Sequence, residues 1–390
     1  MGVGARLWRP SCELVGLAPS RGRHAHFRSG LRPVSLGGGS VGSHDFGNGG
    51  LVMCRPDDPA WLELVRNSPD ATVFHHPAWS SAVQETYGYP AFVLASRMSD
   101  GPLMGGIPVI KVSNPVGRRR LIALPFTDHC PPLLADGADP ALFVEGMARW
   151  QHGHGDRSLE VRAALPAAGA HPQAVGTRHL MALEPDVEGV FRRLHRNRIQ
   201  KRVRRSREAG VEVTLSRSRD ELDVFYRLHC ETRRRQGVPV QPRRFFERLW
   251  QNVIEPGLGF VITARTAGVP IATALFLRWN RHLIYKYGAS DRTRWNLGAN
   301  FLVHWTAIEW GCANGCTTYD LGRTDAGHES LRAFKAGWGA EEVPLIYTHI
   351  GTLAPKLERG LAPVALAHLI RHSPAVVGRV LGEVLYRYAA

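Results

Sequence analysis

Charged side chains stand just after two predicted strands, where the loops of an α/β protein meet its binding sites. Asp128 follows the apolar strand 120–125, and its carboxylate could orient an amine, accept its proton, or form an ordinary turn. Asp320 and Arg323 flank a glycine at the end of the strand 317–321. They either bind a charged substrate or pair with each other. The pattern therefore predicts a polar site at strand ends, suited to proton transfer or ion binding.

Two phenols, Tyr285 and Tyr287, stand two positions apart in the predicted strand 282–290. Side chains two apart on a strand share one face, so both are predicted to point the same way. They either line a substrate cleft, where a phenol can protonate a leaving group, or pack in the core with satisfied hydroxyl groups.

A loop that could bind an anion precedes the predicted helix 298–314. Gly298, Ala299 and Asn300 open this helix after the segment 294–297. The exposed N–H groups and the positive end of the helix dipole favour an anion there, and small residues allow it to approach the backbone. The alternative is an ordinary helix start without a ligand.

The formal net charge of +15 is concentrated in a few segments. The run 192–207 contains nine basic residues and no acid, whereas the rest of 51–351 is close to neutral. This run either attracts an anionic donor or acceptor, or forms a solvated helix face. It carries no interleaved aromatic platform and no recognisable reader motif, so DNA is not an expected partner.

The order of predicted elements indicates an α/β (α+β) fold in two similar halves. Helices and strands are mixed from 51 to 186, and again, after a basic helix at 187–208, up to residue 351. The predicted helices include 77–87, opened by Pro77, and 329–337. The predicted strands include 259–266 and 269–279, which a turn at Gly268 joins in a hairpin. We therefore expect an N-terminal domain at 51–186 and a C-terminal domain at 187–351, each a mixed sheet flanked by helices. Residues 1–50, rich in Gly, Ser and Arg, are predicted to be a disordered or non-native tail, with Met53 as an alternative start.

Several short stretches between residues 70 and 345 form a recognisable series. They are Phe74-His75-His76-Pro77-Ala78-Trp79, Ala123-Leu124-Pro125-Phe126-Thr127-Asp128, Pro270-Ile271-Ala272, Tyr287-Gly288-Ala289-Ser290, Asp320-Leu321-Gly322-Arg323 and Phe334-Lys335-Ala336-Gly337-Trp338-Gly339. In their order and spacing these stretches resemble the FemAB-like branch of the GNAT acyltransferase superfamily. The C-terminal segment resembles the tail of the FemAB branch that is encoded with polysaccharide export systems.

The resemblance implies tandem GNAT-like domains that transfer an acyl or aminoacyl group to an amine of a cell-envelope or exopolysaccharide precursor. It places Lys335 near the second-domain site, where an ammonium would hold a donor phosphate or the developing oxyanion. The implied co-substrate is acyl-CoA or aminoacyl-tRNA, without a tightly bound cofactor or a metal. The predicted catalytic residues are Lys335, Asp128 and Tyr287, and the predicted substrate-binding residues are Tyr285, Asp320, Arg323, Gly298, Ala299 and Asn300.

The sequence is also compatible with two other functions. One is an acyl-CoA-dependent GNAT N-acetyltransferase acting on a small metabolite. The other is a non-catalytic protein that binds polysaccharide or nucleic acid through the basic run 192–207. Either enzyme would have an anionic acyl donor and an amine acceptor as its partners.

The C-terminal segment 352–390 has an amphipathic pattern. Apolar residues alternate with Arg371, Arg379 and Arg387, and Ser373-Pro374 divides the segment into two parts. Such a segment either lies on an anionic membrane or packs on its own domain. No apolar window approaches the roughly 18 residues of a membrane span. The chain is therefore predicted to be cytoplasmic, with peripheral contact to the inner face of the membrane through this tail.

Overall fold

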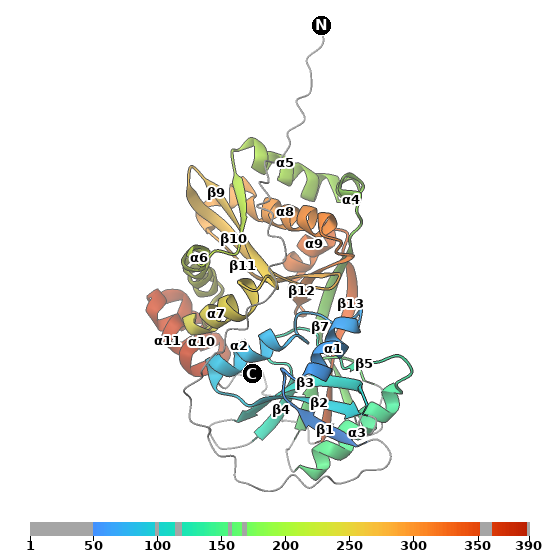
Figure 1. Cartoon of the computed structure of the whole chain (residues 1–390). Coiled ribbons are helices and arrows are strands. Elements are labelled where there is room, and N and C mark those ends of the chain that lie inside the picture. The colour runs from blue at the N-terminus through green and yellow to red at the C-terminus, as the bar shows by residue number, and fades with distance from the viewer. Residues whose placement is uncertain are drawn as a thin grey trace, which may run out of the picture. The chain divides into compact units, whose positions relative to one another are not determined.

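The structure is a computed structural model that describes residues 50–97, 101–113, 119–154, 158–165, 170–351 and 361–387. The tail predicted at 1–50 lies outside these residues except for its last position. The described residues belong to one compact unit of mixed α/β architecture, in agreement with the predicted fold class (Figure 1).

Proline and a capping side chain begin the helices of the described first half. The helices α1 (Pro59–Asn67), α2 (Pro77–Tyr87) and α3 (Pro140–Gly153) start at Pro, whose fixed φ suits the first turn. The preceding Asp58, His76 and Asp139 each accept a hydrogen bond from a first-turn N–H group. The strands of this half are β1 (Leu51–Cys54), β2 (Ala91–Arg97), β3 (Leu103–Ser113), β4 (Arg119–Ala123), β5 (Leu133–Leu134), β6 (Ser158–Val161) and β7 (Ala170–Ala182).

The second half follows the predicted order closely. The bounds predicted for one helix, at 329–337, and three strands, at 259–266, 269–279 and 282–290, are those observed, as are those of the first-half helix 77–87. The strands are β8 (Glu212–Ser216), β9 (Gly259–Thr266), β10 (Val269–Trp279), β11 (His282–Ser290), β12 (Thr318–Thr324) and β13 (Glu341–Gly351). The helices are α4 (Val187–Arg193), α5 (Lys201–Glu208), α6 (Asp220–Gln236), α7 (Arg243–Leu249), α8 (Ala299–Ala313), α9 (Glu329–Gly337), α10 (Leu361–His372) and α11 (Ala375–Leu385).

The basic helix predicted as continuous over 187–208 is interrupted. Leu194 leaves the helical conformation at ψ 150°, and a π-helical turn at Arg196–Gln200 then leads into α5. The Gln200 side chain donates to the carbonyls of Arg192 and Leu194, which the break leaves without helical partners. The break therefore gives α4 and α5 different directions, and the basic residues do not share one face.

One continuous sheet joins the two halves. Its order is β1-β2-β3-β4-β6-β13-β7-β12-β11-β10-β9-β8, with β5 paired to β3. The last strand, β13, pairs with β6 of the first half, whereas β7 of the first half pairs with β12 of the second. Each half thus receives a strand from the other, and the long antiparallel pair β7–β13 runs between them. The domain boundary predicted near residue 186 stays a prediction, and the sheet continues across it.

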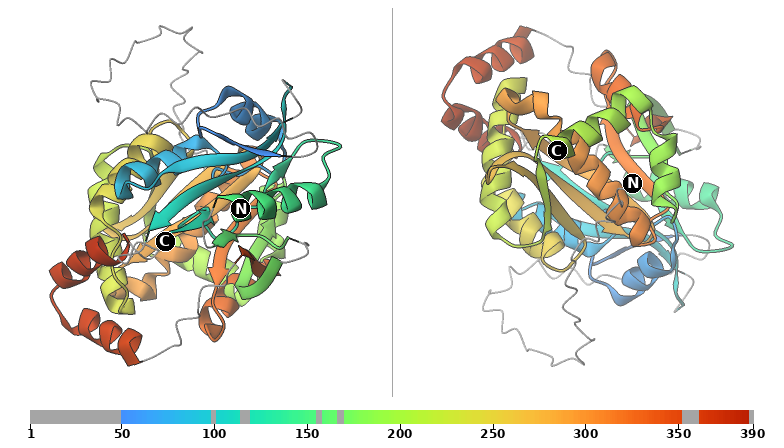
Figure 2. Two further views of the ribbon diagram at one scale, coloured as in Figure 1. Left: turned by 90° about the horizontal axis from the view of Figure 1, so that it is seen from below. Right: turned by 90° about the horizontal axis from the view of Figure 1, so that it is seen from above.

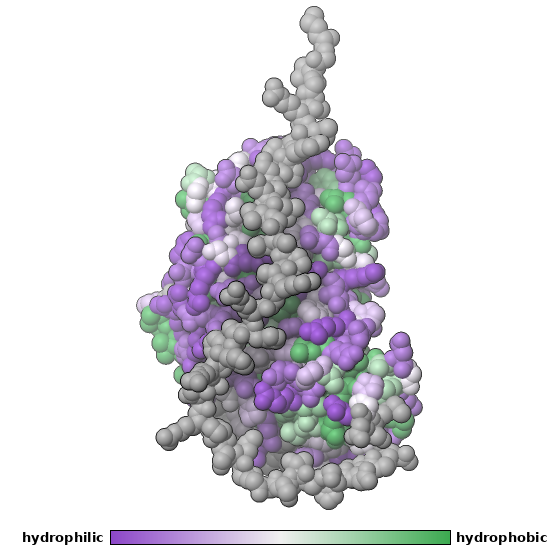
Figure 3. Space-filling model, in the orientation of Figure 1, coloured by the Kyte–Doolittle hydropathy of each residue, from purple (hydrophilic) through white to green (hydrophobic). Residues whose placement is uncertain are grey.

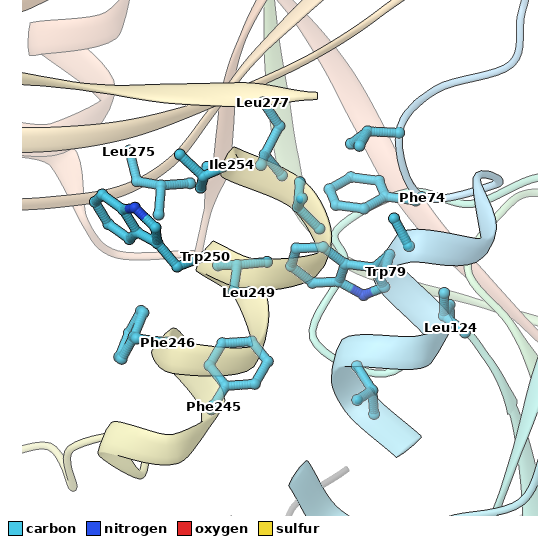
Figure 4. Close-up of a cluster of buried hydrophobic side chains, with 14 of the residues drawn as sticks. Phe74, Trp79, Leu124, Phe245, Phe246, Leu249, Trp250, Ile254, Leu275 and Leu277 are labelled. Carbon is cyan, nitrogen blue, oxygen red and sulfur yellow. The ribbon is translucent and has the colours of Figure 1, made fainter. Parts of the chain in front are cut away.

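Hydrophobic packing also crosses the two halves. Figure 4 shows Trp79 and Phe74 of the first half directed toward α7 and the following turn, from which Phe245 and Leu249 project. The Trp79 and Phe245 ring centroids lie 6.2 Å apart with an edge-on geometry. Figure 2 places α10 and α11 against α6, on the outside of this region. The two halves therefore share a core as well as a sheet.

Replacing Trp79 with Ala is expected to lower the free energy of unfolding by about 3–5 kcal/mol, because the indole is fully buried between the halves. Because the core is shared, denaturant unfolding should remain a single transition. Trp295→Ala is the control, since this indole is 51% exposed and should change stability by only about 0.5 kcal/mol. Two separated transitions in wild type would contradict a shared core.

Candidate active site

A cavity of about 730 Å³ lies where β10 and β11 meet the N-terminus of α8. Gly298, Ala299 and Asn300, predicted to bind an anion, all line it, and so does Tyr285. The structure therefore brings four of the predicted binding residues to one cavity. Lys335, Asp128, Tyr287, Asp320 and Arg323 are not among its lining residues.

Gly298 shapes the α8 end of this cavity. Its φ of 69° lies in the left-handed region that glycine adopts without a steric penalty, and it is the N-cap of α8 without a capping side chain. The first N–H groups of a helix have no intrahelical acceptor, so those of Ala299 and Asn300 are available to a ligand. A 15-residue helix adds the positive end of its dipole at the same point.

Three arginines from different elements add positive charge to the cavity. Arg202 comes from α5, Arg235 from α6 and Arg294 from the loop before α8. Arg235 is fixed by donation to the Ser290 carbonyl at 3.0 Å, and its guanidinium lies 5.0 Å from the half-exposed Trp295 ring. The single carboxylate of the lining is Asp291, which accepts from Thr293. The cavity is therefore suited to an anion.

The prediction that Tyr285 and Tyr287 share one face is wrong. The strand β11 contains a bulge, because Tyr287 pairs with Leu275 while Tyr285 pairs with the adjacent Phe276. The extra residue between them is Lys286, which shifts the alternation by one position. Tyr285 consequently faces the cavity and the core beneath α8, whereas Tyr287 packs on the opposite side against Phe245 and Phe246. Burial raises the pKa of Tyr285 to about 12, so this phenol is neutral at physiological pH.

Lys286, at the bulge, belongs to a group of charged side chains that we call the charged cluster. The cluster comprises Asp128, Arg162, Arg178, Lys286, Asp320, Arg323 and Lys335, contributed by both halves of the chain. The ammonium of Lys286 lies 5.7 Å from the rings of Phe74 and Trp79 and 5.2 Å from that of Tyr287. Burial lowers the pKa of Lys286, although the charge of Asp128 acts in the opposite direction.

Asp128 is the half-buried carboxylate at the centre of this cluster. Burial raises its pKa, but the positive charges of Lys286, Arg162 and Arg323 outweigh that effect and hold the pKa below its usual value. The backbone N–H of Arg323 also donates to it. Gly322 lies close by, since a Cβ built on it would be 3.5 Å from Asp128 Oδ2. Asp128 is therefore ionised at neutral pH and lies against the end of β12.

Lys335 reaches the same strand end from α9. Its Nζ donates to the carbonyl oxygens of Gly322 and Arg323, both at 2.8 Å, and the residue is only 3% exposed. An ammonium has three N–H donors, so one remains after these two bonds. Burial lowers the pKa of Lys335 to about 8, against the raising effect of Asp128 and Asp320. The amine is therefore mostly protonated at pH 7 and titrates just above it.

Asp320 and Arg323 do not pair with each other. Asp320 accepts from Arg178 Nε at 2.7 Å and from the Gly322 N–H at 2.8 Å, whereas Arg323 donates to Asp325 at 2.6 Å. Arg178 comes from β7, so the strand exchanged between the halves supplies the counterion of Asp320. Asp320 is buried at 4% exposure, and its carboxylate holds the β12 end in shape.

Reasoning from sequence missed Lys286 and Arg178 as site residues, and it included Arg202 only as a member of the basic run 192–207. Lys286 is one of only five lysines and stands between the two predicted tyrosines, which was an available signal. Arg178 and Arg202 are single members of 44 arginines, so composition could not select them. Among the residues that the structure describes, no group of three or more His, Cys, Asp or Glu is placed to hold a metal ion.

Part of the chain, including the cavity, is similar to known acyltransferases. Residues 193–335, which run from α4 to Lys335, match the family described as acetyltransferase (GNAT) domain. The chain is 25% identical over 223 residues to the UDP-N-acetylmuramoylpentapeptide-lysine N(6)-alanyltransferase of Weissella viridescens. The aligned region covers 56% of this chain and 63% of that relative. Residues 193–335 are therefore similar to a GNAT acetyltransferase domain, and the chain is similar to a Fem-type alanyltransferase over part of that relative's length.

Solved structures of distant sequence have the same fold as this chain. The crystal structure of FemX superposes with a TM-score of 0.62 at 14% identity and covers 74% of this chain and 94% of FemX. The L-PGS structure from Bacillus licheniformis gives a TM-score of 0.52 at 12% identity, covering 82% and 99% of the two chains. The GNAT match includes the cavity at Gly298 and ends at Lys335, whereas Asp128 lies outside it.

Proposed function

We propose that this protein is a FemAB-like N-acyltransferase that moves an acyl or aminoacyl group from an anionic donor to an amine of a cell-envelope or exopolysaccharide precursor. One observation carries the proposal. On both β11 and α9, a residue that lines the cavity is followed directly by a lysine of the charged cluster. Tyr285 and Phe334 line the cavity, while their neighbours Lys286 and Lys335 belong to the cluster. A donor in the cavity would thus lie beside the groups that handle protons and charge.

The donor would be acyl-CoA or aminoacyl-tRNA, bound as a co-substrate. Both are phosphorylated, which suits the free N–H groups of Ala299 and Asn300 and the guanidinium groups of Arg202 and Arg235. The relative from Weissella viridescens carries the name of an alanyltransferase acting on a muramoylpentapeptide lysine. That name supports an amine acceptor of the cell-envelope class.

The reaction would proceed by direct attack of the amine on the donor carbonyl. The acceptor ammonium first loses one proton to solvent, because only the neutral amine has a lone pair for the attack. Asp128 would orient this amine and take a second nitrogen proton as the C–N bond forms. The remaining N–H of Lys335 would stabilise the negative charge that develops on the carbonyl oxygen. When the carbon–oxygen or carbon–sulfur bond to the carrier breaks, the carrier leaves as an anion and is protonated from solvent. No covalent acyl-enzyme is required.

The direct test incubates the purified protein with a UDP-linked muramoyl pentapeptide and either alanyl-tRNA or acetyl-CoA. Transfer should increase the acceptor mass by one alanyl or one acetyl group, as measured by mass spectrometry. No mass increase with any amine acceptor, under conditions where the donor binds, would overturn the proposal.

A second candidate is acyl-CoA-dependent acetylation of a small metabolite. The match of residues 193–335 to an acetyltransferase domain favours it. Release of free coenzyme A thiol with small amines, and no transfer to the muramoyl peptide, would select this alternative.

Arg202→Ala should raise the Kd of the donor about tenfold, because one charge-assisted contact to a phosphate is lost. Equilibrium binding of coenzyme A and of aminoacylated tRNA is measured separately. The Kd values of wild type and variant are compared for the ligand that wild type binds more tightly. Arg205→Ala is the matched control, since Arg205 is exposed on the same helix and does not line the cavity. Equal effects of the two substitutions would indicate diffuse attraction by the basic run instead of a defined contact.

A further inference from the structure

The last helix, α11, has apolar residues on two opposite sides. A helix on the surface of a globular protein normally has one apolar side, which faces the core. The inner side of α11 packs against α6 and the segment around Val240. Its outer side carries further valines that face solvent. No packing partner covers this second apolar side among the residues that the structure describes.

Close backbone contact secures the inner side. Gly382 lies so near Val240 that a Cβ on this glycine would overlap the Val240 carbonyl, and the Val240 N–H donates to the Gly378 carbonyl at 3.2 Å. Glu383 pairs with Arg244 of α7 at 3.3 Å. The orientation of α11 is therefore set by packing, and its outer side is held away from the core.

The exposed apolar residues form a stripe that we call the valine stripe. Val376, Val380 and Val384 are 53%, 60% and 56% exposed and follow one another at a spacing of four residues. Leu369 of α10, at 50% exposure, adds to them. Figure 3 shows apolar surface at the left edge of the molecule, where Figure 1 places α11. The valine stripe itself thus lies on α11 alone, and Leu369 adds an exposed aliphatic side chain on the neighbouring helix.

Basic residues accompany the valine stripe. Arg371 on α10, Arg379 on α11 and Arg387 just after α11 are exposed. Arg371 donates to the Gln236 carbonyl of α6 at 3.1 Å and keeps its charge. The one acid of the described residues 361–387, Glu383, pairs with Arg244. An exposed apolar stripe on a helix pair with excess positive charge complements a surface that is apolar inside and negatively charged at its edge.

We infer that the valine stripe and its arginines bind the surface of an anionic lipid bilayer. A second copy of the chain fits less well, because it would bring the same arginines face to face. Four half-exposed aliphatic side chains also supply far less than the roughly 800 Å² that each partner buries in a stable protein interface. On a bilayer the valines would enter the boundary between headgroups and acyl chains, and the arginines would contact lipid phosphates.

The end of α11 lies close to the loop that carries Asp128. Tyr386 directly follows α11, and its ring lies 6.0 Å from that of Phe126, in the loop that carries Asp128. Its hydroxyl accepts from Arg233 Nη2 at 2.5 Å. Membrane contact would therefore be made close to the first-half loop of the charged cluster. The inference about lipid binding itself does not rest on the proposed reaction.

The test is flotation of the full-length protein with vesicles of phosphatidylcholine, with and without phosphatidylglycerol. We expect the protein to float with the anionic vesicles and to do so less at high salt. The double variant Val376→Asp, Val380→Asp should reduce the bound fraction about tenfold or more, because it places carboxylates in the apolar boundary. Val269→Asp is the matched control, since Val269 is 48% exposed on a distant hairpin and should not change binding.

Charge reversal separates this surface from the basic run. Arg379→Glu should weaken flotation, whereas Arg205→Glu on α5 should not. Flotation lost only in Arg205→Glu would overturn the inference, and so would absence of wild-type binding to anionic vesicles. Equal losses in the Val269 control and the double variant would also overturn it. Dimerisation in solution that the double variant abolishes would assign the stripe to a second copy instead.

Discussion

Lys335→Met is expected to lower kcat/KM by a factor of about 10²–10³, the usual effect of removing one donor from a developing oxyanion. The loss should appear mainly in kcat, since the side chain lies outside the donor cavity. Met keeps the length of the buried stem but leaves the Gly322 and Arg323 carbonyls without their Nζ donor, so a loss of about 1–3 kcal/mol in stability is expected. Activity and thermal unfolding are measured on the same preparation.

The pH dependence provides an independent readout for Lys335. Its pKa in the folded protein is lowered from 10.5 to about 8, so the ammonium predominates below pH 8 and is lost above it. If the ammonium stabilises the transition state, kcat should fall as the pH rises through about 8. Lys335→Arg, which stays charged at high pH, should have lower activity but no such decline. Lys201→Met, an exposed lysine on α5, should leave both quantities unchanged. A wild-type rate that keeps rising above pH 8 would instead point to a neutral amine acting as a base.

Asp128→Asn is expected to lower kcat by a factor of about 10²–10⁴, as for loss of a general base. The amide keeps the shape of the side chain but lacks the negative charge that would orient the amine, and it cannot accept the nitrogen proton. Because the carboxylate is ionised throughout the neutral range, wild-type activity should show no acidic limb from this group near pH 7. The measurement is single-turnover transfer at saturating donor and acceptor.

Asp57→Asn is the control for Asp128, because Asp57 is an exposed carboxylate that pairs only locally with Arg55. Binding of the donor to Asp128→Asn should be retained, since Asp128 does not line the donor cavity. Full activity of Asp128→Asn would show that this residue takes no part in the reaction and serves only as the counterion of Lys286. If activity is lost, retained donor binding shows that the reaction is impaired and that the variant is still folded.

Local sequence patterns predicted much of the fold. Proline at the first turn located α2, and the apolar runs on either side of Gly268 located β9 and β10 with their observed bounds. These features depend on residues a few positions apart, so they can be recognised without knowing the tertiary structure. The missed break at Leu194 depends on the side chain of Gln200 folding back on the helix end, which no periodicity indicates.

The site was predictable to a smaller extent. Gly298 and its two successors were found because a small-residue helix start has a local signature, and they do line the cavity. Tyr285 and Tyr287 were assigned to one face because the bulge at Lys286 has no signal in the sequence. Asp320 and Arg323 were considered as mutual partners, but their partners Arg178 and Asp325 are decided by strand pairing and loop geometry. Whether the predicted catalytic residues catalyse transfer stays a prediction.

The sequence by itself determined the type and order of the elements, the resemblance to FemAB-like proteins and the rarity that singles out Lys335. Only the tertiary structure decided that β7 and β13 are exchanged between the halves, and this exchange brings Arg178 to Asp320. It also decided that Asp128, 207 residues before Lys335 in the chain, lies against the same strand end. The physical reason is that helix and strand preferences act over a few residues. A site shared between two halves depends instead on strand pairing and packing between residues far apart in the chain.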